Sequence, residues 1–140
     1  MSNLPDDFNS RIAHAVQLLQ EMMQSSGLRF DSHLRSRLPG EHGIYRIYDE
    51  RQPNITLRAG RTKTAAGGLR QRVYSNHFMG DQEGNFRQQM VDCGRCANLG
   101  SAKQFLKDHC RVQLVVINDA EERKWIEHFI LSILRPIHCD

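Results

Sequence analysis

The chain has 140 residues, a length that suits one domain with a single hydrophobic core. Charged residues make up 25% of it, an ordinary fraction for a globular protein, and the formal net charge is +3. No stretch approaches the ~18 consecutive apolar residues of a membrane span, and the first residues lack the apolar segment of a secretory signal. We therefore expect a cytoplasmic protein without a membrane partner, whose four cysteines are thiols or metal ligands.

Positive charge is concentrated in one part of the chain. Residues 51–80 hold six cationic side chains and no Asp or Glu, so this window carries +6 and the remainder of the chain −3. Fifteen of the nineteen cationic residues are arginine, whose forked guanidinium group suits contact with phosphate. The window favours a polyanionic partner, and the alternative is a solvated surface strip that acids balance in three dimensions.

The first predicted element is a helix that begins near Pro5 and stops at Gly27. Its apolar residues recur with 4-3-4-3 spacing and form one stripe: Phe8, Ile12, Ala15, Leu19 and Met22. The stripe spans only two heptads, so we expect the helix to pack on its own domain, with a homodimer contact as the functional alternative. Residues 28–39 are irregular and basic and connect this helix to the main fold.

The main fold begins with a predicted hairpin. Residues 43–48 alternate and are rich in aromatic and β-branched side chains, which predicts a strand, and residues 55–59 form its partner after a turn at Pro53. A loop over 60–68 is followed by helices over 69–76, 86–91 and 101–109. The apolar run 112–117 predicts a buried strand, and Asn118-Asp119 caps a last helix over 120–134 that ends at Pro136.

This order of elements predicts an α/β (α+β) fold. We expect a small, mainly antiparallel three-stranded sheet flanked by helices. Residues 1–40 form an N-terminal helical extension and connector, and residues 41–140 form the domain itself.

Glu127 lies within the apolar face of the last predicted helix. At 100° per residue it falls between Leu134 and Leu131 on a continuous apolar arc. A carboxylate in that position is costly unless something pairs with it. Either an arginine forms an ion pair with it, or it points into a cleft and binds a hard divalent cation, Mg²⁺ or Mn²⁺.

Five short motifs follow one another in a characteristic order. They are Gly43-Ile44-Tyr45, Arg58-Ala59-Gly60, Leu69-Arg70-Gln71-Arg72, His77, and Glu127 followed by Pro136. The order resembles that of the GIY-YIG nuclease family, and the resemblance covers residues 41 to about 139. In that family a GIY strand and a YIG strand precede a helix with an essential arginine, often a histidine, and a metal-binding glutamate in the C-terminal helix.

The resemblance implies a metal-dependent DNA endonuclease with a defined set of site residues. Its catalytic residues would be Tyr45, Arg72, His77 and Glu127. Tyr45 would take a proton from the attacking water, directly or with His77, and Arg72 would stabilise the charge that grows on the phosphate. The cofactor would be Mg²⁺ (or Mn²⁺) on Glu127. The DNA-binding residues would be Arg58, Gly60, Arg61, Lys63 and Arg70.

The chain departs from the family pattern at several positions. Arg58 and Ala59 stand where the family has tyrosine and isoleucine, His77 follows Arg72 by five residues rather than four, and Cys139 stands where asparagine is frequent. Loss of the second tyrosine leaves three readings open. The chemistry is altered, or the domain is a catalytically impaired DNA-binding module, or another group compensates, for which the candidates are Tyr48, Tyr74 and His42.

Cys93-Gly94-Arg95-Cys96 forms half of a zinc-site motif. A tetrahedral site would need further ligands, for which the candidates are His109, Cys110, His138 and Cys139. The second half of the motif is missing, so free thiols are the alternative interpretation. If zinc does bind at Cys93 and Cys96, the chain could be a zinc-stabilised interaction domain.

Overall fold

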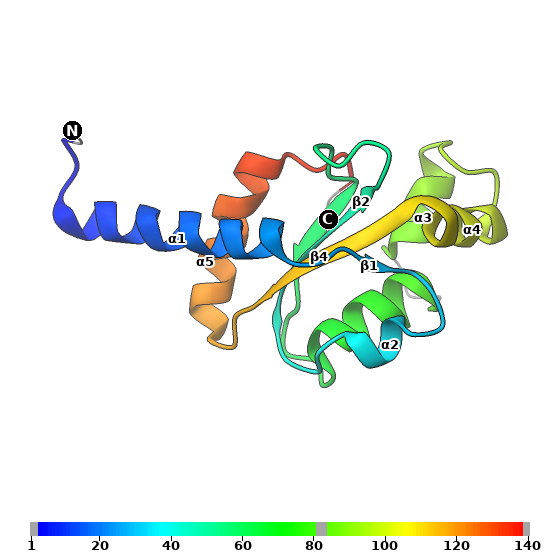
Figure 1. Ribbon diagram of the computed structural model, residues 1–140, viewed down its shortest axis with the longest axis horizontal. Helices are drawn as coiled ribbons and strands as arrows, with labels where there is room; N and C mark the ends of the chain where they lie inside the picture. The colour runs from blue at the N-terminus through cyan, green and yellow to red at the C-terminus, as the bar shows by residue number, and fades with distance from the viewer. Residues whose placement is uncertain (1–2, 81–83, 139–140) are drawn as a thin grey trace.

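The computed structural model describes residues 3–80 and 84–138, and four strands form its sheet (Figure 1). The strands are β1 (Leu28–Arg29), β2 (Gly43–Asp49), β3 (Arg58–Arg61) and β4 (Cys110–Val116). Their order is β1-β4-β2-β3, and each neighbouring pair is antiparallel. The helices are α1 (Asp6–Gln24), α2 (Leu34–Arg37), the π-helix η1 (Arg70–Phe78), α3 (Phe86–Asp92), α4 (Leu99–His109) and α5 (Ala120–Leu134).

Helices cover both faces of the sheet, and alternation along β2 divides the core into two clusters. Every residue of β2 is buried. Ile44 packs with residues of α1 and α5 on one face, to the left in Figure 1. Tyr45 and Ile47 point to the other face, where residues of α2, η1, α3 and α4 complete the larger cluster. The alternation arises because successive side chains of a strand point to opposite faces.

The mixed α+β class is confirmed, but the prediction of three strands is wrong because there are four. Strand β1 lies in the segment that we predicted to be irregular, and two residues are too few to produce a sequence period. The second hairpin strand begins at Arg58 rather than Ile55, because turn hydrogen bonds hold the preceding residues. Helix η1 closes with a bond from the Met79 amide to the Tyr74 carbonyl, five residues back, which a π-helix allows.

The buried residues of helix α1 lie in its second half. Ala15 and Met22 are buried, whereas Phe8 and Ile12 are 47% and 44% exposed on the half that projects from the body (Figure 1). The homodimer contact predicted for this helix therefore remains a prediction. In the part of the chain that the structure describes, no helix is long and apolar enough to cross a membrane.

The boundary that we predicted at residue 40 also remains a prediction. Residues before it take part in the main fold: β1 pairs with β4, and Phe30, Leu34 and Leu38 belong to the larger core cluster.

The C-terminal segment lies along the start of β3, the strand at one edge of the sheet. The Ile137 amide donates to the Thr56 carbonyl at 3.0 Å, and the His138 amide donates to the Leu57 carbonyl at 2.7 Å. Arg58 and His138 form a parallel bridge. The polypeptide backbone therefore covers the first part of this edge.

Gly43 is required by the close approach of β2 and β4. A Cβ atom at this position would collide with the Val115 carbonyl oxygen and lie 3.0 Å from Cδ1 of Leu69. We predict that Gly43→Ala lowers the free energy of unfolding by about 1–3 kcal/mol, the usual cost of overpacking, in urea denaturation followed by circular dichroism. Gly40→Ala is the matched control, because the nearest atom to its Cβ would be 3.9 Å away. Equal stability of the two variants would contradict the prediction.

Candidate active site at the edge of the sheet

Tyr45 reaches from the central strand toward the edge of the sheet. It pairs with Gly60 of β3, and a Cβ atom on that glycine would lie only 3.2 Å from the Tyr45 hydroxyl oxygen. The absent side chain therefore gives the phenol room to lie over the edge strand. Tyr45 itself has no exposed surface.

The hydroxyl of Tyr45 is held by His77 of η1. Its oxygen lies 2.6 Å from Nε2 of His77, and the two rings are tilted by 52°. On the other side of the imidazole, Nδ1 accepts a hydrogen bond of 3.0 Å from the backbone amide of Phe86. An amide N–H only donates, so Nδ1 carries no proton and the neutral ring has its proton on Nε2. His77 therefore donates to the oxygen of Tyr45.

The surroundings of His77 keep the imidazole neutral. The ring is completely buried, and burial is the largest cause that holds its pKa well below the usual value of 6.5. The positive charges of Arg58, Arg72 and Arg87 lower this pKa further. A neutral ring with its proton on Nε2 is thus the form that meets Tyr45.

A hollow whose lining residues are mostly polar lies at the same edge of the sheet. Its volume is about 210 Å³, and the loop after β3 and the first turns of η1 line it. Three cationic side chains contribute to its wall, those of Arg61, Lys63 and Arg72. The lining residues that the structure describes carry positive charge and hydrogen-bond donors, which suit a phosphate group.

Arg72 connects the hollow to the buried pair. It lines the hollow, and its charge also lowers the pKa of His77. Arg72 is therefore close enough to act electrostatically on the Tyr45–His77 pair.

Glu127 of α5 approaches the same edge from the opposite face of the sheet. Its carboxylate forms an ion pair with Arg61, the residue after Gly60, and only 23% of the Arg61 side chain and 11% of the Glu127 side chain are exposed. The pairing is the first of the two alternatives raised for Glu127. Among the described residues, no three His, Cys, Asp or Glu side chains converge as a metal cluster would require.

Arg123 fixes the backbone of the basic loop, a role that was not foreseen from the sequence. This buried side chain donates to the carbonyls of Thr62 at 2.9 Å and Lys63 at 3.2 Å, and also to that of Ile117 at 2.9 Å. Arg123 precedes Glu127 by one helical turn, and this spacing could have indicated that both side chains lie on the same buried face of α5. The Phe86 contact had a weaker signal, an Asn85 N-cap that leaves the first amide of α3 without a partner inside the helix.

Two residues expected to bind DNA lie elsewhere. Arg58 has no exposed surface and donates to the Gly84 carbonyl at 3.1 Å and to the Gln89 side chain, beneath α3. Arg70 donates to the Arg35 carbonyl at 3.0 Å and so ties η1 to α2. We therefore correct the expectation that Arg58 contacts the DNA backbone, because a buried side chain is not available to it.

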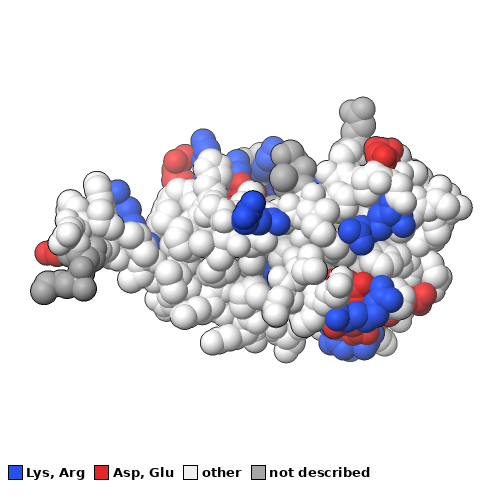
Figure 2. All heavy atoms as spheres, turned by 90° about the horizontal axis from the view of Figure 1, so that it is seen from above, with Lys and Arg blue, Asp and Glu red and all other residues white. Residues whose placement is uncertain are grey.

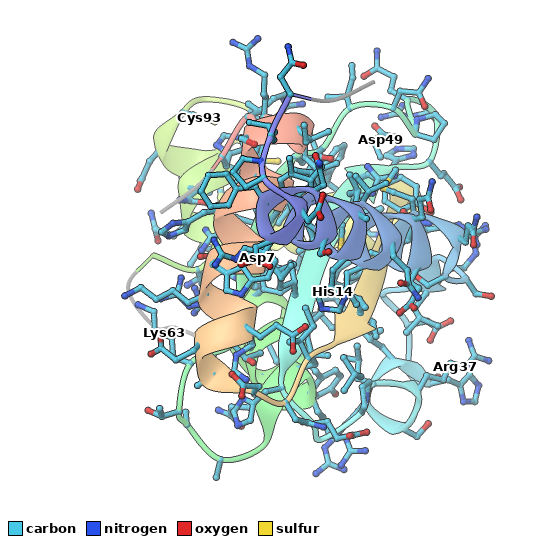
Figure 3. All side chains as sticks on the ribbon, turned by 90° about the vertical axis from the view of Figure 1, so that its left-hand side faces the viewer. Asp7, His14, Arg37, Asp49, Lys63 and Cys93 are labelled. Carbon is cyan, nitrogen blue, oxygen red and sulfur yellow. The ribbon has the colours of Figure 1, made fainter. Side chains whose placement is uncertain are left out.

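The cationic window is accordingly not one continuous surface. Arg51 forms an ion pair with Asp49 at 2.7 Å, away from the hollow. On the face shown in Figure 2, Lys and Arg side chains lie in separate groups, some with Asp and Glu beside them. In Figure 3, Lys63 lies next to the first turns of α5, from which Arg123 donates to the Lys63 carbonyl.

The three candidates to replace the missing tyrosine contact other residues in the structure. The Tyr48 ring lies 4.3 Å from the guanidinium of Arg46, and Tyr74 packs edge-on against Phe78. His42 bonds to the Thr62 hydroxyl at 2.9 Å, next to the hollow.

The cysteine motif lies at the end of α3, on a different part of the surface. Cys93 Sγ is 3.7 Å from Nε2 of His138, and Cys96 is half-buried. Cys110 belongs to the core, and burial raises the pKa of its thiol to about 12. Cys139 lies outside the described residues, and zinc at Cys93 and Cys96 remains a prediction.

The lowered pKa of His77 makes the stability of the fold depend on pH. Unfolding frees the imidazole to bind a proton below about pH 6.5, whereas the folded state resists protonation, so stability is complete above this pH and falls below it. We predict that His77→Gln, whose amide can still donate to Tyr45, loses less of its melting temperature than the wild type between about pH 7.5 and 5. His128→Gln, on the exposed face of α5, is the control. Equal slopes for wild type and His77→Gln would show that another group dominates.

The chemistry of the site is inferred from the geometry of this chain alone. Comparisons with models of protein families, with curated proteins and with solved structures find no match. What the described residues bring together is a phenol held by a neutral imidazole, a cationic hollow next to it, and a carboxylate that is paired with an arginine of the same hollow.

Proposed function

We propose that the protein is a metal-dependent DNA endonuclease that hydrolyses phosphodiester bonds, as its resemblance to the GIY-YIG nuclease family implies. The observation that carries the proposal is the hydrogen-bonded Tyr45–His77 pair beside a hollow lined by arginine and lysine. Hydrolysis of a phosphodiester needs a group that takes a proton from water and cations that hold the phosphate. Tyr45 and the cations of the hollow lie in one region of the edge of the sheet, which supports the proposal.

Tyr45 is the proposed proton acceptor in its phenolate form, which arises when the phenol releases its own proton to solvent, and His77 is a positioning residue. The Nε2–H of His77 points at the phenol oxygen, so it stabilises a phenolate and does not accept the proton from it. Because Tyr45 has no exposed surface, water reaches the oxygen only when neighbouring side chains rearrange. DNA that enters the adjacent hollow is the event that we expect to cause this.

Arg72 and Lys63 are the proposed phosphate contacts. Arg72 is half-buried between the hollow and His77, where it can stabilise charge on the reacting phosphate. Lys63 is exposed at the rim and suits the flanking backbone. Such contacts give affinity that depends on salt and little on sequence.

Glu127 is the residue that would hold Mg²⁺ or Mn²⁺. A single carboxylate fits a magnesium ion that keeps several waters and takes its other oxygens from phosphate, which is common for this ion. Once bound, the ion would polarise the scissile phosphate and stabilise the leaving oxygen. To provide this ligand, Glu127 has to leave the ion pair with Arg61.

A DNA-binding module without catalysis is the second candidate. Two observations favour it: Tyr45 is covered, and the family's second tyrosine is replaced by the buried Arg58. Both candidates bind DNA through the same hollow, and only the first cuts it.

The function is tested by incubating the protein with supercoiled plasmid, with and without Mg²⁺ or Mn²⁺. We predict nicking that requires the metal and that falls by about 10²–10⁴-fold in Tyr45→Phe, the usual cost of losing a general base. Glu127→Gln should also be inactive while it still binds DNA.

Tyr48→Phe is the matched control for this experiment. It removes the other phenol of β2, whose ring stacks on Arg46 on the opposite face, and should cut at close to the wild-type rate. Binding without nicking by the wild type would select the second candidate. Nicking by Tyr45→Phe within a few-fold of wild type would remove Tyr45 from the mechanism.

The phosphate contacts are tested by the salt dependence of DNA binding. We predict that Lys63→Gln weakens binding equally for unrelated duplexes and lowers the slope of log affinity against log salt by about one unit, because one phosphate contact is lost. Fluorescence anisotropy with labelled duplexes measures both effects. Arg51→Gln removes a charge from the same window, but from a residue paired with Asp49, and should leave the slope unchanged. Equal slopes for wild type and Lys63→Gln would place the DNA elsewhere.

A further inference from the structure

The ion pair between Arg61 and Glu127 joins two residues with separate tasks in the proposed function. Arg61 is the last residue of β3 and lines the cationic hollow. Glu127 lies on α5, behind the same edge, and most of both side chains is buried. The pair therefore stands between the phosphate hollow and the carboxylate that would hold the metal.

Metal binding by Glu127 and phosphate binding by Arg61 both compete with the ion pair between them. A guanidinium on the Glu127 carboxylate blocks an oxygen that a divalent cation needs, and the carboxylate equally satisfies donors that Arg61 would offer to a phosphate. Breaking such a partly buried pair from one side leaves an uncompensated charge, which is costly. This cost is avoided when both residues gain new partners at the same time, because a phosphate then binds Arg61 and a cation binds Glu127.

The surrounding backbone allows the side chains to exchange partners without refolding. Arg123 clamps the carbonyls of Thr62 and Lys63, so the loop beyond Arg61 stays attached to α5 when the Arg61 side chain moves. The hollow that Arg61 already lines gives the guanidinium a place to turn to.

We propose that Arg61 exchanges its partner when DNA binds: it holds Glu127 in the free protein and a backbone phosphate in the complex, so that Glu127 accepts a divalent cation only when DNA is present. This inference rests on the proposed function, of which it names the regulation. DNA and metal then bind cooperatively, and each raises the affinity for the other by the same factor. The free protein carries little metal, and the complete site assembles on the substrate.

The test measures Mn²⁺ binding by the loss of the free-ion electron paramagnetic resonance signal, with and without a saturating 16-base-pair duplex. For the wild type we expect the duplex to raise Mn²⁺ affinity about tenfold or more, within the usual range of such couplings. For Arg61→Gln we expect the free protein to bind Mn²⁺ about tenfold more tightly than wild type, and the duplex to add less than about threefold.

Lys124→Gln is the matched control. It removes the same charge from an exposed position of α5 about one turn before Glu127, but among the described residues the ion pair of Glu127 is with Arg61, so its effect on Mn²⁺ affinity should stay within about twofold. If Lys124→Gln raises Mn²⁺ affinity as much as Arg61→Gln, the effect is one of overall charge and the exchange is refuted. Unchanged Mn²⁺ affinity in a folded Arg61→Gln protein refutes it as well.

A second variant opens the pair from the other side and needs no metal. When a chelator removes divalent metal, the Glu127→Gln variant should bind the duplex several-fold more tightly than wild type, because Arg61 is then free of the carboxylate and can contact the phosphate. Glu121→Gln, which removes a charge from the exposed first turn of α5, should change this affinity much less. Equal gains in the two variants would contradict the exchange.

The results separate the exchange from the endonuclease function. If the wild type shows cooperative binding of Mn²⁺ and duplex but never nicks plasmid, the exchange stands and the proposed catalysis fails. If it nicks plasmid with Mg²⁺ and yet binds Mn²⁺ equally well with and without the duplex, catalysis stands and the exchange fails.

Discussion

Strand β2 is enclosed by helices on both faces, so every polar atom on its side chains needs a partner inside the protein. On one face Arg46 donates to Gln113 at 2.8 Å and to Thr56 at 3.0 Å. On the other face the Tyr45 hydroxyl is hydrogen-bonded to His77, which in turn accepts a hydrogen bond from the Phe86 amide. This single chain of hydrogen bonds links β2, η1 and α3. The position of the phenol is thus determined by the core, which holds functional groups more rigidly than a surface loop does.

Local signals in the sequence predicted the elements that contain a long period or a cap. The alternation of residues 43–48 and the Asp119 cap of α5 were of this kind, and both elements are present. Helical periodicity also placed Glu127 on the buried face of α5. Its partner was left open, because Arg61 lies 66 residues away and only the tertiary fold brings the two together. The histidine–amide contact at Phe86 depends on the fold in the same way.

The charge of residues 51–80 shows what composition does not reveal. A count treats the six cations alike, but the structure gives them different surroundings. Arg51 pairs with Asp49, Arg58 is buried with carbonyl and amide partners, and only Arg61, Lys63 and Arg72 line the hollow. Burial decides which of these charges an incoming polyanion meets. Arg58 still acts on the site, since its buried charge helps to keep His77 neutral.

The edge of the sheet at β3 is divided between two uses. An uncovered edge strand offers free backbone groups to any other strand, which is a cause of aggregation. Here the C-terminal residues occupy the carbonyls of Thr56 and Leu57, while no strand in the described ranges pairs with the outer side of Gly60 and Arg61. The unprotected length is therefore about two residues, too short to nucleate strand exchange between molecules. A chain truncated before Ile137 would free the carbonyls of Thr56 and Leu57 and so lengthen the open part of the same edge that carries the site.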